Sequence, residues 1–250
     1  MSNEGHCRNS GGITKIPVIM CPPAGAAYLL SEGRRLACLV RHGQTDWNLE
    51  RRLQGRERVP LNETGIAQSA ECGKLFAAAR DEGLEIGASF VSPLERAAVT
   101  AKAVTDELGI DGADTVDLLI ERDYGNLSGL TPDERRELYR SGEVYGVESV
   151  EDTAHRMKKA LVEIYSRTKS GAALVVTHGG IINALFSCIT LGTTGTGKNY
   201  SENCGVSLVA VGRDVTIPLA YGLTGDIFLN YIKELIAALS KETRGTENDE

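Results

Sequence analysis

Two short apolar runs in this chain each lead to a histidine that is followed by glycine. Residues 36–40 (LACLV) lead through Arg41 to His42, and residues 172–177 (AALVVT) lead to His178. Near-continuous apolar runs of this length are typical of buried strands in a parallel sheet. Ligands of open α/β sheets bind beyond the carboxyl ends of such strands. Two of the four histidines are therefore predicted to stand where a ligand would bind.

The side chains at the first strand end suit phosphoryl chemistry. The guanidinium of Arg41 can grip phosphate oxygens with two parallel hydrogen bonds, and a neutral His42 can attack phosphorus and carry the group covalently. Taken alone, the tripeptide is more often a surface turn, and either histidine alone is more often a core residue whose hydrogen bonds are satisfied. The placement of both histidines at strand ends favours the functional interpretation.

A third candidate, Arg96, follows the short predicted strand at residues 89–91. Ser92 and Glu95 have the spacing of a capping box, with Pro93 at the first helical position. This pattern places Arg96 in the first turn of a helix, where backbone N–H groups and the helix dipole favour an anion. The alternative is a solvated surface charge.

An acid, Glu121, follows a predicted strand at residues 116–120 and precedes a second capping box at residues 131–134. A carboxylic acid near the phosphorus could protonate the leaving oxygen and later deprotonate water. The alternative is an exposed acid of the kind that most glutamates are.

Together these segments resemble the histidine phosphatase superfamily, also called phosphoglycerate mutase-like. The order and the spacing match at residues 41–43, 92–101, 121–129 and 177–180, and further correspondences lie at residues 61–68 and 148–152. The resemblance covers residues 36–235.

The resemblance implies a two-step transfer in which His42 attacks the substrate phosphorus and water or an acceptor discharges the phosphohistidine. Glu121 would be the general acid and then the general base, while fixed positive charge stabilises the transition state without a metal or a cofactor. The implied catalytic residues are His42, Glu121, Arg41, Arg96 and His178, and the implied substrate-binding residues are Asn48, Gln44, Thr45, Gln54, Gly55 and Gly179.

The superfamily contains phosphatases and mutases, and the sequence favours a phosphatase. Members that resemble phosphoglycerate mutase carry a long insertion between the acid and the second histidine and usually Asn-Ser after its His-Gly. Here the interval from Glu121 to His178 is short, and Gly180 follows Gly179. A mutase, which is an isomerase, is the alternative, and a non-catalytic binding protein on the same fold is the second alternative.

Substrate choice is expected to depend on the loop after His42 and on the insertion at residues 130–149. The loop carries Arg51, Arg52, Arg56 and Arg58. These arginines favour a small phosphorylated metabolite with a second anionic group. The alternative is a solvated loop in which the arginines pair with neighbouring glutamates.

The whole sequence predicts one α/β domain with a mostly parallel central sheet, helices on both faces and a short insertion over the site. We expect the domain at residues 36–240, a partly disordered N-terminal extension at residues 1–35 and a mobile tail at residues 241–250. Two amphipathic helices, near residues 150–167 and 226–239, and a hairpin at residues 206–219 complete it. The apolar stretch at residues 16–30 could pack on the domain or on a second subunit of a homodimer.

Charge and cysteine content exclude several classes of partner. A net charge of −7 argues against binding to nucleic acid. The prolines among residues 16–30 exclude a membrane-spanning helix in that segment. Six cysteines without metal-like spacing indicate reduced thiols and a cytoplasmic protein.

Overall fold

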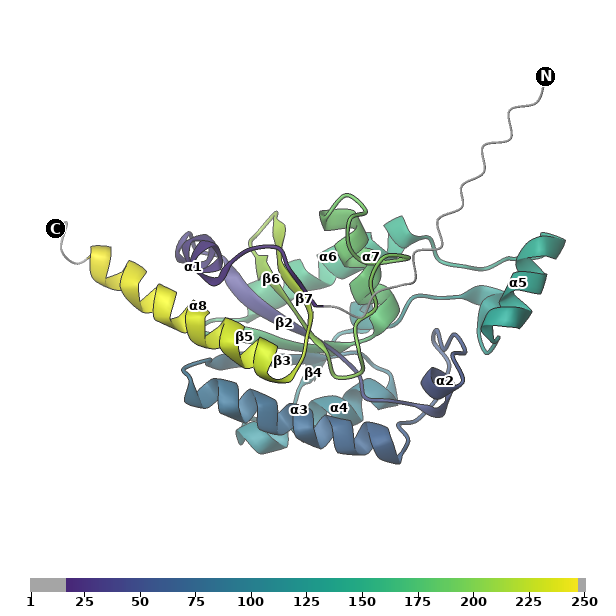
Figure 1. Ribbon diagram of the computed structural model, residues 1–250, viewed down its shortest axis with the longest axis horizontal. Coiled ribbons are helices and arrows are strands. Elements are labelled where there is room, and N and C mark those ends of the chain that lie inside the picture. Colours follow the sequence, from purple (N-terminus) through teal and green to yellow (C-terminus); the bar gives the residue numbers. More distant parts are fainter. Residues whose placement is uncertain (1–16, 247–250) are drawn as a thin grey trace, which may run out of the picture.

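A seven-stranded mixed sheet forms the centre of the protein, seen in a computed structural model that describes residues 17–246 (Figure 1). The strand order is β1-β7-β6-β2-β5-β3-β4. The strands are β1 (Val18–Ile19), β2 (Arg35–Arg41), β3 (Ile86–Val91), β4 (Asp114–Thr115), β5 (Ala172–Thr177), β6 (Val206–Val211) and β7 (Thr216–Leu223). Strands β2, β5, β3 and β4 run parallel, whereas β6, β7 and β1 add antiparallel pairs.

Helices cover both faces of this sheet (Figure 1). They are α1 (Pro23–Ser31), α2 (Asp46–Leu49), α3 (Glu63–Asp81), α4 (Glu95–Leu108), α5 (Pro132–Ser141), α6 (Val150–Arg167), α7 (Gly179–Ile189) and α8 (Gly225–Thr246), with 3₁₀ turns η1 (Asp117–Leu119) and η2 (Gly125–Leu127). The predicted α/β domain with helices on both faces is confirmed. The sheet is more evenly mixed than expected, because the predicted hairpin at residues 206–219 pairs with β2 through β6.

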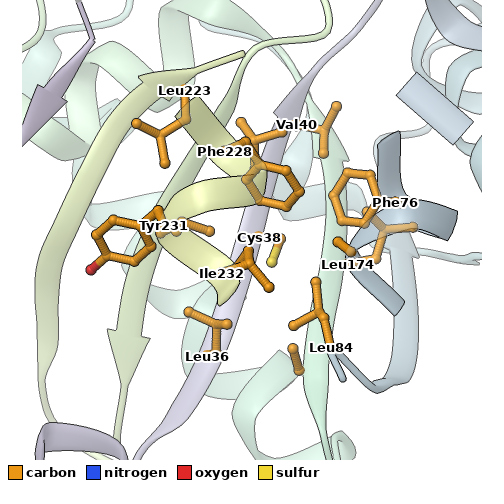
Figure 2. Close-up of a cluster of buried hydrophobic side chains, with 14 of the residues drawn as sticks. Leu36, Cys38, Val40, Phe76, Leu84, Leu174, Leu223, Phe228, Tyr231 and Ile232 are labelled. Carbon is orange, nitrogen blue, oxygen red and sulfur yellow. The ribbon is translucent and has the colours of Figure 1, made fainter. Parts of the chain in front are cut away.

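The sheet separates the hydrophobic core into two clusters, and side chains of β2 point alternately into one and the other. Leu36, Cys38 and Val40 point into a cluster with side chains from α1, α3, α4 and α8, part of which Figure 2 shows. Ala37 and Leu39 point into a second cluster with α6 and α7. Successive side chains of a strand face opposite sides of the sheet, so the apolar residues 36–40 of β2 serve both cores and are all buried.

Two local predictions are wrong. Residues 116–120 do not form a strand, since β4 spans only Asp114–Thr115 and the following residues turn into η1. The capping box at Ser92 is absent as well, because α4 starts at Glu95 with Leu94 as its N-cap. The second capping box, at Thr131 and Glu134, is confirmed.

The segment before the predicted domain packs on that same domain. Strand β1 pairs with β7 at the sheet edge, and the hydroxyl of Tyr231 on α8 donates to the carbonyl of Cys21 at 2.9 Å. The predicted disorder of residues 1–15 lies outside the described residues. Helix α8 continues to Thr246, into the segment predicted as a mobile tail.

Candidate active site

Three parallel strands bring the predicted catalytic segments together at one edge of the sheet. Arg41, the last residue of β2, is in register with Thr177, the last residue of β5. The backbone N–H of His42 donates to the carbonyl of Thr177 at 3.0 Å. The backbone N–H of Ser92, just beyond β3, donates to the carbonyl of Val176 at 3.0 Å. The ladder thus continues beyond the strand ends and fixes the backbone of the site.

The ring of His42 is held with one nitrogen committed to the protein. Its Nδ1 lies 2.7 Å from the carbonyl oxygen of Gly43, and because a carbonyl only accepts, Nδ1 carries the hydrogen. Burial and the nearby Arg96 and Arg41 guanidiniums hold the pKa of His42 well below its usual 6.5. The ring is therefore neutral at physiological pH, and the lone pair is on Nε2.

Buried nitrogens without a partner lie around this ring. Arg41 Nε, Arg96 Nε and His178 Nδ1 are all buried and have no hydrogen-bond partner in the protein. The ring centroids of His42 and His178 are 5.2 Å apart. Burial, Arg96 and His42 also lower the pKa of His178. Buried polar groups are almost always paired, so this cluster of unpaired nitrogens indicates a place built for an anion.

Hydrogen bonds from the terminal nitrogens of the two guanidiniums fix their orientation. Arg96 donates to the carbonyls of Glu57 at 2.7 Å and Gly55 at 2.8 Å. Arg41 donates to the carbonyl of Ser201 at 2.6 Å, and its guanidinium lies 4.6 Å from the ring centre of Tyr200. Burial lowers the pKa of Arg96 to about 10, which leaves it charged at neutral pH.

Glu121 is held by backbone N–H groups at the start of α7. Its Oε1 accepts from Ile181 and Arg122, both at 2.8 Å, and its Oε2 accepts from Gly180 at 2.9 Å. Arg156 on α6 donates to the carbonyl of Ile120 at 2.6 Å and so holds the backbone next to Glu121 in place. The carboxyl group is thus oriented before any substrate arrives.

A cavity of about 660 Å³ opens beside these groups. It is lined by Arg41, His42, Asn48, Arg51, Arg52, Leu53, Gln54, Glu121, Tyr124, Arg135, Gly179, Asn183, Tyr200 and Ser201. Six of these are predicted catalytic or substrate-binding residues, namely Arg41, His42, Asn48, Gln54, Glu121 and Gly179. Arg96 and His178 do not line the cavity, and both lie near His42.

The other predicted binding residues divide into two groups. Asn48 and Gln54 line the cavity. The oxygen of Asn48 accepts from Thr45 and from Asn203, each at 3.2 Å, so its amino group is what it can offer to a ligand. Gln44, Thr45 and Gly55 are absent from the lining: Gln44 bonds Gln68 and Asn62, Thr45 caps α2, and Gly55 accepts from Arg96.

Sequence reasoning missed several residues of the cavity wall. Arg135 comes from α5, and Tyr200, Ser201 and Asn183 come from α7 and the segment after it. For Arg135 a signal existed, because the capping box at Thr131 fixes the start of α5 and so places Arg135 one turn into the helix. The others follow from long-range packing and carry no local signal.

Comparison with known proteins agrees with this geometry. The family described as the histidine phosphatase superfamily (branch 1) matches residues 37–222. The chain belongs to this superfamily. The match includes all five predicted catalytic residues, so the resemblance inferred from short motifs is confirmed at the level of the family.

Relatives within the superfamily differ in their names. A 2,3-bisphosphoglycerate-dependent phosphoglycerate mutase of Methylorubrum extorquens is 33% identical in an alignment of 209 residues that covers 77% of this chain and 97% of the relative. An uncharacterized phosphatase, PhoE, of Bacillus subtilis is 35% identical over 155 residues, 62% of this chain and 77% of the relative. Among solved structures, YhfR of Bacillus stearothermophilus matches with a TM-score of 0.65 and 26% identity, covering 77% of this chain and 99% of that one.

Proposed function

We propose that this protein is a phosphomonoesterase that hydrolyses a small phosphorylated metabolite through a phosphohistidine on His42. The observation that carries the proposal is the set of unpaired buried nitrogens of Arg41, Arg96 and His178 around a neutral histidine. Phosphoryl oxygens would supply the acceptors that these donors lack. Fixed positive charge of this kind stabilises the charge that spreads over the phosphoryl oxygens in the transition state.

The two half-reactions follow from the geometry. In the first, the Nε2 lone pair of His42 attacks phosphorus, the ester P–O bond breaks, and Glu121 gives its proton to the leaving oxygen. The Nδ1 hydrogen bond to Gly43 stabilises the positive charge that develops on the ring. In the second, water attacks phosphorus, Glu121 takes a proton from it, the N–P bond breaks, and phosphate leaves with His42 neutral again.

The cavity walls support a substrate with a second anionic group. Arg52 is engaged with Glu50 and with the carbonyl of Gly129, so it is mainly structural. Arg51 also lines the cavity, and its charge adds to the effect of burial in lowering the pKa of Arg135, so the two side chains lie near each other. Two guanidiniums facing one cavity repel each other unless an anion lies between them. We assign this place to a carboxylate or second phosphate of the substrate.

A specific observation favours the second candidate, a phosphoglycerate mutase-type isomerase. The relative that carries that name aligns with this chain over 97% of its own length at 33% identity. The short interval between Glu121 and His178 therefore does not exclude a mutase. Against it stands α5, which buries no residue and so forms a thin shield for a phosphohistidine that a mutase must protect from water.

Phosphate release from a panel of phosphorylated metabolites tests the proposal. Wild type is compared with His42→Ala, and a parallel assay measures isomerisation primed with a bisphosphoglycerate. We expect release without primer, its loss in His42→Ala, and a phosphoryl group on His42 that mass spectrometry detects after alkaline quenching. Primed isomerisation without release would instead establish the mutase, and inactivity in both assays would favour a non-catalytic binding protein.

A further inference from the structure

Ser92 makes a contact that neither a helix cap nor the reaction above accounts for. Its hydroxyl oxygen lies 2.7 Å from Nε2 of His178, and both side chains are buried, with 1% and 0% of their surface exposed. The two residues are 86 positions apart in the chain. They meet because β3 and β5 are parallel neighbours that end at the same edge.

The surroundings of both groups favour one direction for this hydrogen bond. The Ser92 oxygen already accepts from the backbone N–H of Leu94 at 3.3 Å, while its own hydrogen is free to be donated. His178 is neutral, since burial and the Arg96 charge lower its pKa, so its ring carries one hydrogen. If Ser92 donates to Nε2, that hydrogen is on Nδ1.

The other ring nitrogen then becomes a donor directed at the anion site. Nδ1 of His178 is buried and unpaired beside His42 and Arg96. A lone pair at this place would repel a phosphoryl oxygen, which can only accept, whereas an N–H would bind it. The bound anion and Ser92 therefore select the same tautomer from opposite sides of the ring.

We propose that Ser92 is a positioning residue that donates to His178 Nε2 and so holds His178 as an Nδ1–H donor to the transferring phosphoryl group. The proposal rests on the proposed function only in naming the phosphoryl group as the acceptor. The tautomer itself is a property of the resting protein and is measured without turnover.

The first test is ¹⁵N NMR of the full-length protein labelled at histidine, recorded with and without orthovanadate as the anion probe. His178→Gln assigns the signals. We expect His178 with its hydrogen on Nδ1 in wild type, and a shift toward the other tautomer or a mixture in Ser92→Ala. A wild-type His178 with its hydrogen on Nε2 in the vanadate complex would overturn the proposal.

The second test compares kinetics with a matched control from the same strand. Ser89 on β3 is also buried, and its hydroxyl has no partner, so Ser89→Ala removes the same atom without touching His178. We expect Ser92→Ala to lower kcat by about tenfold or more with a smaller change in KM, because the lost donor acts on the transition state. Ser92→Thr, which keeps the hydroxyl, should recover part of kcat.

The outcomes separate this proposal from the function it serves. If Ser92→Ala and Ser89→Ala both retain wild-type kcat, the positioning role is refuted while the phosphatase stands. If wild type releases no phosphate from any substrate, the proposed function fails, and the NMR experiment alone decides the tautomer. Thermal unfolding of each variant identifies any that fail to fold.

Discussion

Gly180 allows the acid to sit against the start of α7. A Cβ at this position would lie 2.5 Å from the hydroxyl of Tyr124 and 2.7 Å from Oε1 of Glu121, distances that require one of them to move. We expect Gly180→Ala to lower kcat by about 100-fold, the scale of a displacement of about 1 Å at a reacting group. Steady-state kinetics measures this effect.

Gly112→Ala is the matched control, because an added Cβ there meets nothing within 4 Å. Equal activities of the two variants would show that Glu121 tolerates the displacement. The result also bears on the choice between a phosphatase and a mutase. Members that resemble phosphoglycerate mutase usually carry a residue larger than glycine after His-Gly, and such a residue would require Glu121 to lie in a different position from the one seen here.

At this scale the sequence predicted which residues gather but not how they are bonded. His42, Arg41 and Glu121 were identified because strand ends and motif spacing are local signals. Ser92 was predicted to cap a helix, which is wrong. The local sequence does not distinguish a serine in a capping box from a serine that hydrogen-bonds to a distant histidine. The contact between Ser92 and His178 depends on β3 and β5 lying side by side, and the hydrophobic periodicity of the sequence does not indicate which strands are neighbours.

Among the elements, α5 carries Arg135, which we expect to bind the second anionic group of the substrate. Arg135 and Arg136 are adjacent on this helix, yet only Arg135 lines the cavity, whereas Arg136 pairs with Asp133. We expect Arg135→Gln to lower kcat/KM for a phosphorylated hydroxy acid by roughly tenfold or more, the scale of one lost charge-assisted hydrogen bond. Activity on glycerol phosphate, in which a hydroxymethyl group replaces the carboxylate, should change much less.

The control for this prediction is Arg136→Gln, which removes the same charge one position further along. A uniform loss with both substrates, or equal effects of the two variants, would show that Arg135 supports the fold of α5 and does not recognise the second anion.

The strongest patterns were predicted within a residue or two, apart from the helix predicted at residues 226–239, which begins as predicted but continues to Thr246 as α8. The helix at residues 150–167 coincides with α6 because an amphipathic repeat over five turns leaves little freedom. Residues 116–120 are apolar and short, so their pattern suits a strand as well as a buried turn. The chain adopts η1 there, and Leu119 enters the core beside α6.

For the whole molecule, two buried neutral histidines make stability depend on pH. His42 and His178 have pKa values well below 6.5 in the folded protein, while the unfolded chain protonates them near pH 6.5. The unfolded state therefore binds more protons below that pH, and the free energy of unfolding falls as pH falls. Each histidine contributes a slope of about 1.4 kcal/mol per pH unit at most.

Urea unfolding between pH 7.5 and 5 measures this slope. We expect His42→Gln to reduce it by about the contribution of one histidine, whatever the variant does to stability at pH 7.5. His155→Gln, on the exposed side of α6, is the control. An unchanged slope in His42→Gln would mean that the ring takes up its proton in the folded state.

Fold class and family followed from the sequence, whereas the assembly did not. None of the helices in the described part of the chain is long and apolar enough to cross a bilayer. A homodimer, the absence of a nucleic-acid partner and the cytoplasmic location stay predictions. The extension at residues 18–31 lay outside the recognised motifs, and only its pairing with β7 and packing against α8 showed that it completes the sheet and one core.

The contrast between β2 and α5 has a consequence for how this enzyme can diverge. Amide hydrogens of β2 are shielded by both cores and should exchange with solvent only on global unfolding, whereas those of α5, which buries no residue, should exchange through local opening. Substitutions in α5 therefore cost little stability. Under the proposed function, substrate preference can therefore change through substitutions in that helix, whereas His42 directly follows a strand enclosed by both cores, where substitutions cost more stability.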